Sequence, residues 1–162
     1  MQYRFETLTR DDFPMIHSWL AQPHISGWWG SGPVETKLMD EDIESGKTDM
    51  RIVWDVPADH PFAYIQDYDT QTFDMPHYVD LPAGARAIDT FLGDPEYLGK
   101  GHASGYLRQR AQQLIDAGAP CVVVDPSPEN ARAVAAYAKA GFERDRIAPC
   151  EDDDPVRIML FH

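Results

Sequence analysis

Hydrophobic positions recur along this chain of 162 residues with two different periods. A period of two, or a short continuous apolar run, predicts a strand, and a period near 3.6 predicts a helix. The expected strands are residues 3–8, 50–56, 62–68, 85–92, 121–124 and 157–161. The expected helices are an early one containing Phe13, Ile16, Trp19 and Leu20, and later ones over residues 34–44, 101–117 and 130–140. Gly46 ends the second helix and Gly141 provides a C-cap for the last.

The order of these elements is strand, two helices, three strands, helix, strand, helix, and a final strand or strands. This order predicts an α/β fold of the α+β type, with a central mixed sheet flanked by helices. The length fits one ordinary domain with a sizeable core, and neither a repeat nor a low-complexity linker interrupts it. We therefore expect residues 1–162 to form a single domain.

Charge limits the possible partners. The net charge is −13 and the sequence pI is about 4.6, which argues against nucleic acid as a partner. The excess of acidic residues fits a cationic small-molecule substrate, a saline habitat or a generally solvated acidic surface. No apolar run is long enough for a membrane span, and the N-terminus lacks a signal-peptide pattern, so no membrane partner is expected.

Cysteine and histidine positions suggest the compartment and the metal content. Cys121 and Cys150 are too few for a disulfide framework, which favours a reducing cytoplasm. The six histidines show no zinc-ligand spacing, so no metal is expected.

A glycine-rich turn precedes the predicted helix over residues 101–117. Its sequence, over residues 95–103, is Pro-Glu-Tyr-Leu-Gly-Lys-Gly-His-Ala. A helix start offers unpaired backbone N–H groups and the positive end of the helix dipole, which together attract an anion. Gly99 and Gly101 would let the backbone approach a phosphate closely. The alternative is an ordinary turn without a ligand.

Residues 95–103 resemble the acetyl-CoA pyrophosphate loop of the GNAT superfamily of N-acetyltransferases. Residues 125–133, Asp-Pro-Ser-Pro-Glu-Asn-Ala-Arg-Ala, and residues 137–144, Tyr-Ala-Lys-Ala-Gly-Phe-Glu-Arg, resemble the second signature of that superfamily. Together with His24-Ile25 and Trp28-Trp29, these segments look like the aminoglycoside 6'-N-acetyltransferase branch. The resemblance implies the GNAT fold and acetyl-CoA as the co-substrate.

The resemblance also implies which residues hold acetyl-CoA. Backbone N–H groups of the loop would cradle the pyrophosphate, and the Lys100 side chain would add a positive charge. The loop residues concerned are Gly99, Lys100, Gly101, His102 and Ala103. The pantetheine arm would pair with the strand over residues 85–92 through the backbone of Phe91 and Gly93. Asn130 would donate to the pantetheine, cap a helix, or do both.

Two residues are implied as catalytic. An ammonium must lose its proton before it attacks a thioester, and Asp89 interrupts an apolar strand where a carboxylate could accept that proton. Tyr137 would assist departure of the thiolate. The alternatives are an Asp89 side chain turned to solvent and a Tyr137 buried for packing.

The branch also implies an acceptor site. Asp74, Asp125, Asp153 and Asp89 would hold the ammonium groups of the antibiotic, and Trp28 and Trp29 would form part of a wall. Alternatively, Asp125 forms an Asp-Pro turn and the tryptophans pack in a core. Asp153 is alternatively one charge of a solvated run, or Asp152 or Asp154 takes its role. Met75-Pro76-His77 stands where the branch usually carries tryptophans, so the expected sugar-facing wall is altered.

The sequence thus predicts an acetyl-CoA-dependent N-acetyltransferase of a cationic small molecule, with the 6'-amine of an aminoglycoside, and so antibiotic resistance, as the leading hypothesis. Acetylation of a hydroxylamine or lysine-type amine in siderophore synthesis is the second. A non-catalytic acyl-CoA-binding module is the third. A monomer or a homodimer is expected.

Overall fold

The structure, a computed structural model, describes residues 2–162, which form two compact units. The first unit extends to Asp67 and includes Asp89–His102, and the second comprises Tyr68–Ile88 and Ala103–His162. Strands β3 (His60–Asp69) and β4 (Arg86–Leu92) each pass from one unit into the other. Within residues 2–162, no helix is long and apolar enough to cross a membrane.

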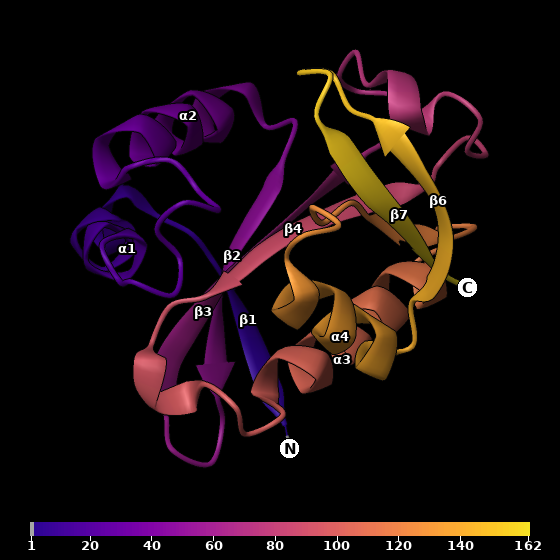
Figure 1. Ribbon diagram of the computed structural model, residues 1–162. Coiled ribbons are helices and arrows are strands. Elements are labelled where there is room, and N and C mark those ends of the chain that lie inside the picture. The colour runs from indigo at the N-terminus through magenta and orange to yellow at the C-terminus, as the bar shows by residue number, and fades with distance from the viewer. Residues whose placement is uncertain (1) are drawn as a thin grey trace. The chain divides into compact units, whose positions relative to one another are not determined.

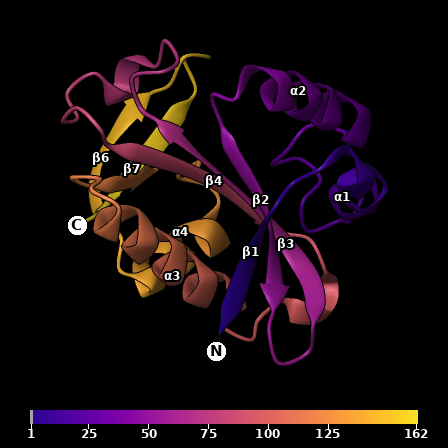
Figure 2. The ribbon, with the colours of Figure 1, turned by 180° about the vertical axis from the view of Figure 1, so that it is seen from behind.

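The first unit combines a sheet with two helices. The strands β1 (Tyr3–Thr7), β2 (Asp49–Asp55), β3 and β4 are adjacent in that order, and β1–β2 and β2–β3 are antiparallel. Helices α1 (Phe13–Leu20) and α2 (Gly32–Ser45) lie side by side in both views (Figures 1 and 2). Their apolar faces share one core with the strands. Its buried members are Leu8, Ile16, Trp19, Leu20, Ile25, Met39, Met50, Ile52, Tyr64 and Phe91.

The end of β4 packs closely on α1. The N–H of Gly93 donates to the Phe62 carbonyl oxygen at 2.8 Å. A Cβ placed on Gly93 would lie only 2.1 Å from the Trp19 ring, which is itself buried. A glycine is therefore required here by packing.

We expect Gly93→Ala to lower the free energy of unfolding by about 1–3 kcal/mol, because the buried indole of Trp19 must move to admit a methyl group. Urea denaturation measures the change. Gly30→Ala is the control, since its Cβ would meet the end of the flexible Glu35 side chain rather than a buried ring. Equal stabilities of the two variants would contradict the close packing of Gly93.

The second unit contains the remaining strands. The order β3, β4, β5 (Val122–Val124), β7 (Pro155–Phe161), β6 (Glu143–Pro149) places β5 parallel to β4, and the other pairs, β5–β7 and β7–β6, are antiparallel. Helices α3 (His102–Asp116) and α4 (Ala131–Ala140) lie side by side in both views (Figures 1 and 2). The buried residues of one core cluster are Tyr68, Tyr78, Ala87, Val123, Val156 and Ile158.

The observed elements confirm the predicted fold class, a mixed sheet with flanking helices. The C-cap is also confirmed, because Gly141 has a φ of 111° and donates to two carbonyl oxygens of α4. Three single-turn 3₁₀ segments complete the fold, namely η1 (Arg10–Asp12), η2 (Pro76–Tyr78) and η3 (Pro95–Tyr97). The sequence pattern did not predict strand β6.

Candidate active site

The glycine-rich turn leads from η3 directly into α3. Gly99 and Gly101 have φ values of 71° and 85°, a conformation that strongly favours glycine. A Cβ on Gly99 would meet no atom within 4 Å, so the surface of the turn is open at this point. The first turn of α3 carries no acidic side chain, and Lys100 is exposed. This local arrangement suits an anionic group such as the pyrophosphate of acetyl-CoA.

Aromatic residues of the first unit support this turn. The Tyr97 ring stacks on Phe62 with centroids 4.4 Å apart, and the Tyr97 hydroxyl donates to Asp55 at 2.9 Å. The His102 Nδ1 atom lies 3.0 Å from the Tyr3 hydroxyl oxygen. Burial lowers the pKa of His102 from its ordinary value. The imidazole at the start of α3 therefore favours its neutral form and acts as a packing and hydrogen-bonding group.

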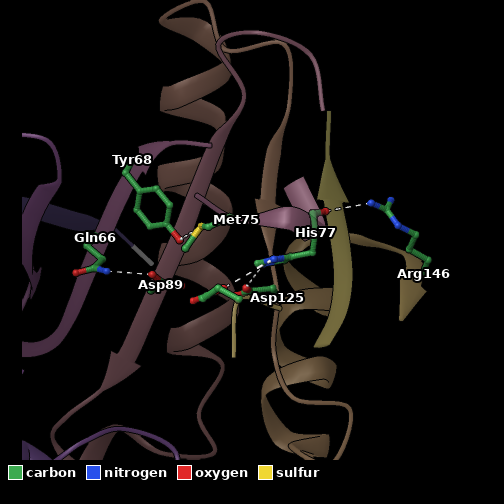
Figure 3. Close-up of polar contacts among 8 residues, drawn as sticks. Gln66, Tyr68, Met75, His77, Asp89, Asp125 and Arg146 are labelled. Carbon is green, nitrogen blue, oxygen red and sulfur yellow. Dashed lines mark hydrogen bonds and ion pairs between the residues drawn. The ribbon is translucent and has the colours of Figure 1, made fainter. Parts of the chain in front are cut away.

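Asp89 is half-buried on β4 and is held by a side chain of β3. Gln66 Nε2 donates to Asp89 Oδ2 at 3.0 Å (Figure 3). Gln66 Oε1 accepts from the Tyr64 hydroxyl at 2.7 Å. Burial, followed by the charge of Asp89, raises the pKa of Tyr64 well above its usual value. Tyr64 thus remains a donor that fixes the orientation of the Gln66 amide. Gln66 is not among the predicted site residues, although a glutamine within an apolar strand is a usable signal.

Trp28 and Trp29, the two tryptophans predicted for the acceptor wall, have different environments. Trp29 makes edge contacts with Phe91 and Tyr64, with centroids 5.0 and 6.3 Å apart, and packs against the core. Trp28 is 50% exposed. Phe91 itself is buried, and the N–H of Gly93 is already bonded to Phe62. A pairing of pantetheine with the backbone of Gly93 would therefore use its carbonyl group.

The second unit contains the other three acids of the acceptor set. Asp125 directly follows β5, and its side chain is 21% exposed. Asp74 is exposed in the segment between β3 and η2. Asp153 is exposed at the turn between β6 and β7, where its φ of 63° is left-handed. Asp152 and Asp154, the alternatives in this run, are exposed as well.

Helix α4 presents the remaining predicted residues. Asn130 Oδ1 accepts from the Ala133 N–H at 3.2 Å, so Asn130 is the N-cap of α4. Its amide nitrogen is the part of the side chain suited to donate to pantetheine. Tyr137 is buried, and its ring makes an edge contact with Phe142, with centroids 5.8 Å apart. The predicted capping role is confirmed, and the packing role of Tyr137 is evident.

The structure places the first signature between a strand and a helix, with a left-handed glycine turn, and the Asp-Pro signature before a second capped helix. The chain belongs to the family described as an acetyltransferase (GNAT) domain, which matches residues 9–149. The family match spans segments of both compact units and confirms the resemblance inferred from the two signatures.

Known relatives are similar over most of the chain. Aminoglycoside N(6')-acetyltransferase type 1 of Klebsiella pneumoniae is 29% identical, over 94% of this chain and 79% of that protein. A kanamycin resistance protein of Rhizobium radiobacter is 38% identical over 47% of this chain and 71% of its own length. The crystal structure of the aminoglycoside acetyltransferase AAC(6')-Ib with coenzyme A and kanamycin is 27% identical with a TM-score of 0.84, covering 99% of this chain and 94% of that chain.

Proposed function

We propose that this chain transfers the acetyl group of acetyl-CoA to the 6'-amine of an aminoglycoside. The observation that carries the proposal is Asp89, a carboxylate fixed by Gln66 on the strand that precedes the glycine turn. Similarity to aminoglycoside N(6')-acetyltransferases along nearly the whole chain supports this choice of acceptor. Incubation with kanamycin and acetyl-CoA, followed by NMR of the product, tests it. A single new acetyl group on the 6'-nitrogen is expected, and acetylation elsewhere would refute the proposal.

The proposed mechanism is direct transfer in a ternary complex. Acetyl-CoA supplies an activated acetyl thioester. Asp89 accepts the proton that the acceptor ammonium loses as its nitrogen bonds to the acetyl carbon, either directly or through a water molecule. Tyr137 provides its hydroxyl proton, or a hydrogen bond, to the sulfur as the carbon–sulfur bond breaks. The second proton that the nitrogen gives up on becoming an amide replaces the proton delivered to the sulfur. Both roles follow from the superfamily pattern that these residues match.

The loop and the cap bind the donor in this proposal. The backbone N–H groups of Gly99 to Ala103, including that of His102, cradle the pyrophosphate, and the exposed Lys100 ammonium adds a screened attraction. Backbone groups of Phe91 and the Gly93 carbonyl pair with the pantetheine arm, and the Asn130 amide donates to it. We further propose that the chain acts as one domain in the cytoplasm, as a monomer or a homodimer, without a metal.

Carboxylates bind the acceptor in this proposal. Asp74, Asp125 and Asp153 attract the several ammonium groups of an aminoglycoside, Asp89 contacts the reacting amine, and exposed Trp28 offers an apolar face to a sugar ring. Trp29 contributes through the core contacts that hold this segment. The set explains why an acidic chain would suit a polycation.

The acceptor KM should rise with salt, because exposed charge pairs are screened over about 8–10 Å near physiological ionic strength. Asp74→Asn or Asp153→Asn should raise the KM for kanamycin by a factor of roughly 1.5–5 each, and the KM for a monoamine by less. Asparagine tolerates the left-handed φ of residue 153, so this change removes charge without backbone strain.

Asp11→Asn and Asp59→Asn are the matched controls, since they remove exposed acids from η1 and from the β2–β3 turn. Steady-state kinetics at two salt concentrations measures all four variants. Equal effects from the two pairs would show that general surface acidity, and not an acceptor site, explains the charge of −13.

A further inference from the structure

A buried histidine lies directly against one of the proposed acceptor carboxylates. The His77 side chain, on η2, is 0% exposed, and its Nε2 atom is 2.8 Å from Asp125 Oδ2 (Figure 3). A carboxylate oxygen accepts hydrogen bonds, so the Nε2 atom carries the hydrogen. The two residues lie 48 positions apart in the sequence but belong to the same compact unit.

Contacts with both the main chain and the ring hold His77 in place. Arg146 Nη2, on β6, donates to the His77 carbonyl oxygen at 3.0 Å, and the ring packs on Tyr78 with centroids 4.0 Å apart. The Nδ1 atom has no hydrogen-bond partner within residues 2–162, and the closest carboxylate oxygen to it, of Glu151, is 3.9 Å away. The bond to Asp125 is thus the one hydrogen bond made by this ring in the described part of the chain.

This arrangement leaves Asp125 with one oxygen fixed from inside the protein. Its Oδ2 atom accepts from a buried donor that cannot turn away, while the side chain stays 21% exposed. Its Oδ1 atom makes no hydrogen bond or ion pair with residues 2–162. A carboxylate held in one rotamer loses less conformational entropy when it binds a cation than one that is free to rotate.

We propose that His77 is a positioning residue that holds Asp125 for an ammonium group of the acceptor. The inference rests on the proposed function, because Asp125 must bind that ammonium. His77 acts on acceptor binding and has no part in the chemical step or in acetyl-CoA binding. A purely structural histidine would instead stabilise the η2 segment without a specific effect on the acceptor.

The test compares three substitutions of His77 at pH 7.5, with kanamycin binding measured by calorimetry and turnover by steady-state kinetics. His77→Phe keeps a ring and removes the donor. His77→Asn is polar, but its amide nitrogen falls near the position of Nδ1 and does not reach Asp125. His77→Gln places an amide nitrogen near the position of Nε2.

We expect His77→Phe and His77→Asn to weaken kanamycin binding about tenfold, with kcat and the acetyl-CoA KM within about twofold of the wild type. His77→Gln should restore the affinity to within about threefold of the wild type. In an Asp125→Asn background, the further change His77→Asn should alter the affinity by less than about twofold, because the carboxylate that it positions is gone. If His77→Phe does not fold, His77→Asn is the donor-free variant that is compared with His77→Gln.

Three outcomes would overturn the proposal: unchanged kanamycin binding in both donor-free variants, equal losses with and without the Asp125 carboxylate, or an equal loss of acetyl-CoA affinity. If the wild type acetylates kanamycin and any of these outcomes is seen, only the role of His77 is rejected and the proposed function stands. Kanamycin binding without acetylation would reject the proposed function, and the affinities would still decide the role of His77. A wild type that does not bind kanamycin would overturn both.

Discussion

Replacing Asp89 by asparagine is expected to lower kcat by about a hundred- to ten-thousand-fold, with little change in acetyl-CoA affinity. The amide cannot accept the proton from the acceptor ammonium, yet its oxygen can still accept from Gln66, so the local hydrogen bond is kept. Steady-state kinetics across neutral pH with the best amine, and calorimetry with coenzyme A, measure the two effects separately.

Asp11→Asn serves as the control for this change, because it removes an exposed acid from the same compact unit. That variant should retain wild-type kcat. If Asp89→Asn also keeps wild-type turnover at every pH tested, Asp89 is not the base, and the proton must leave by another route.

Replacing Gly101 by aspartate is expected to abolish detectable acetyl-CoA binding. The new carboxylate would repel the pyrophosphate, and its Cβ would stand where the backbone must approach the anion. The φ of 85° at this position adds backbone strain, because side chains of L-residues rarely adopt it. Calorimetry on the folded variant measures coenzyme A affinity directly.

Gly118→Asp separates strain from ligand repulsion. Gly118 also has a positive φ, 110°, beyond the opposite end of α3, and a Cβ there would meet no atom within 4 Å. This control should lose stability but keep coenzyme A affinity. Nearly unchanged affinity in a folded Gly101→Asp variant would remove the glycine turn from the donor site.

The sequence pattern predicted nearly every element whose side chains enter a core. Strand β5 is an uninterrupted apolar run, and α4 combines an apolar face with an Asn cap and a Gly end, so both were located within one residue. Strand β6 is absent from the prediction because it is an edge strand whose residues are all exposed or half-buried, which leaves no apolar alternation to detect. Backbone pairing with β7 forms this strand although its own sequence carries no strand pattern.

The candidate site was only partly predictable for a related reason. The glycine turn and the Asp-Pro signature are local, and local chemistry marks them in the sequence. The contacts that orient side chains join distant positions, as in Tyr3 with His102, which are 99 residues apart. His77 shows the limit most clearly, because it lies in a polar segment where nothing in the sequence indicates a fully buried ring beside Asp125.

The most direct test of the account is an acetyl-CoA turnover assay with a panel of amines. The panel contains kanamycin, ribostamycin, a simple monoamine, free lysine and a hydroxylamine, each measured with the wild type and with Asp89→Asn. The aminoglycosides are expected to give the highest kcat/KM, and Asp89→Asn is expected to abolish most of that turnover. A preference for lysine or the hydroxylamine, or no release of coenzyme A with any amine, would contradict the proposed function.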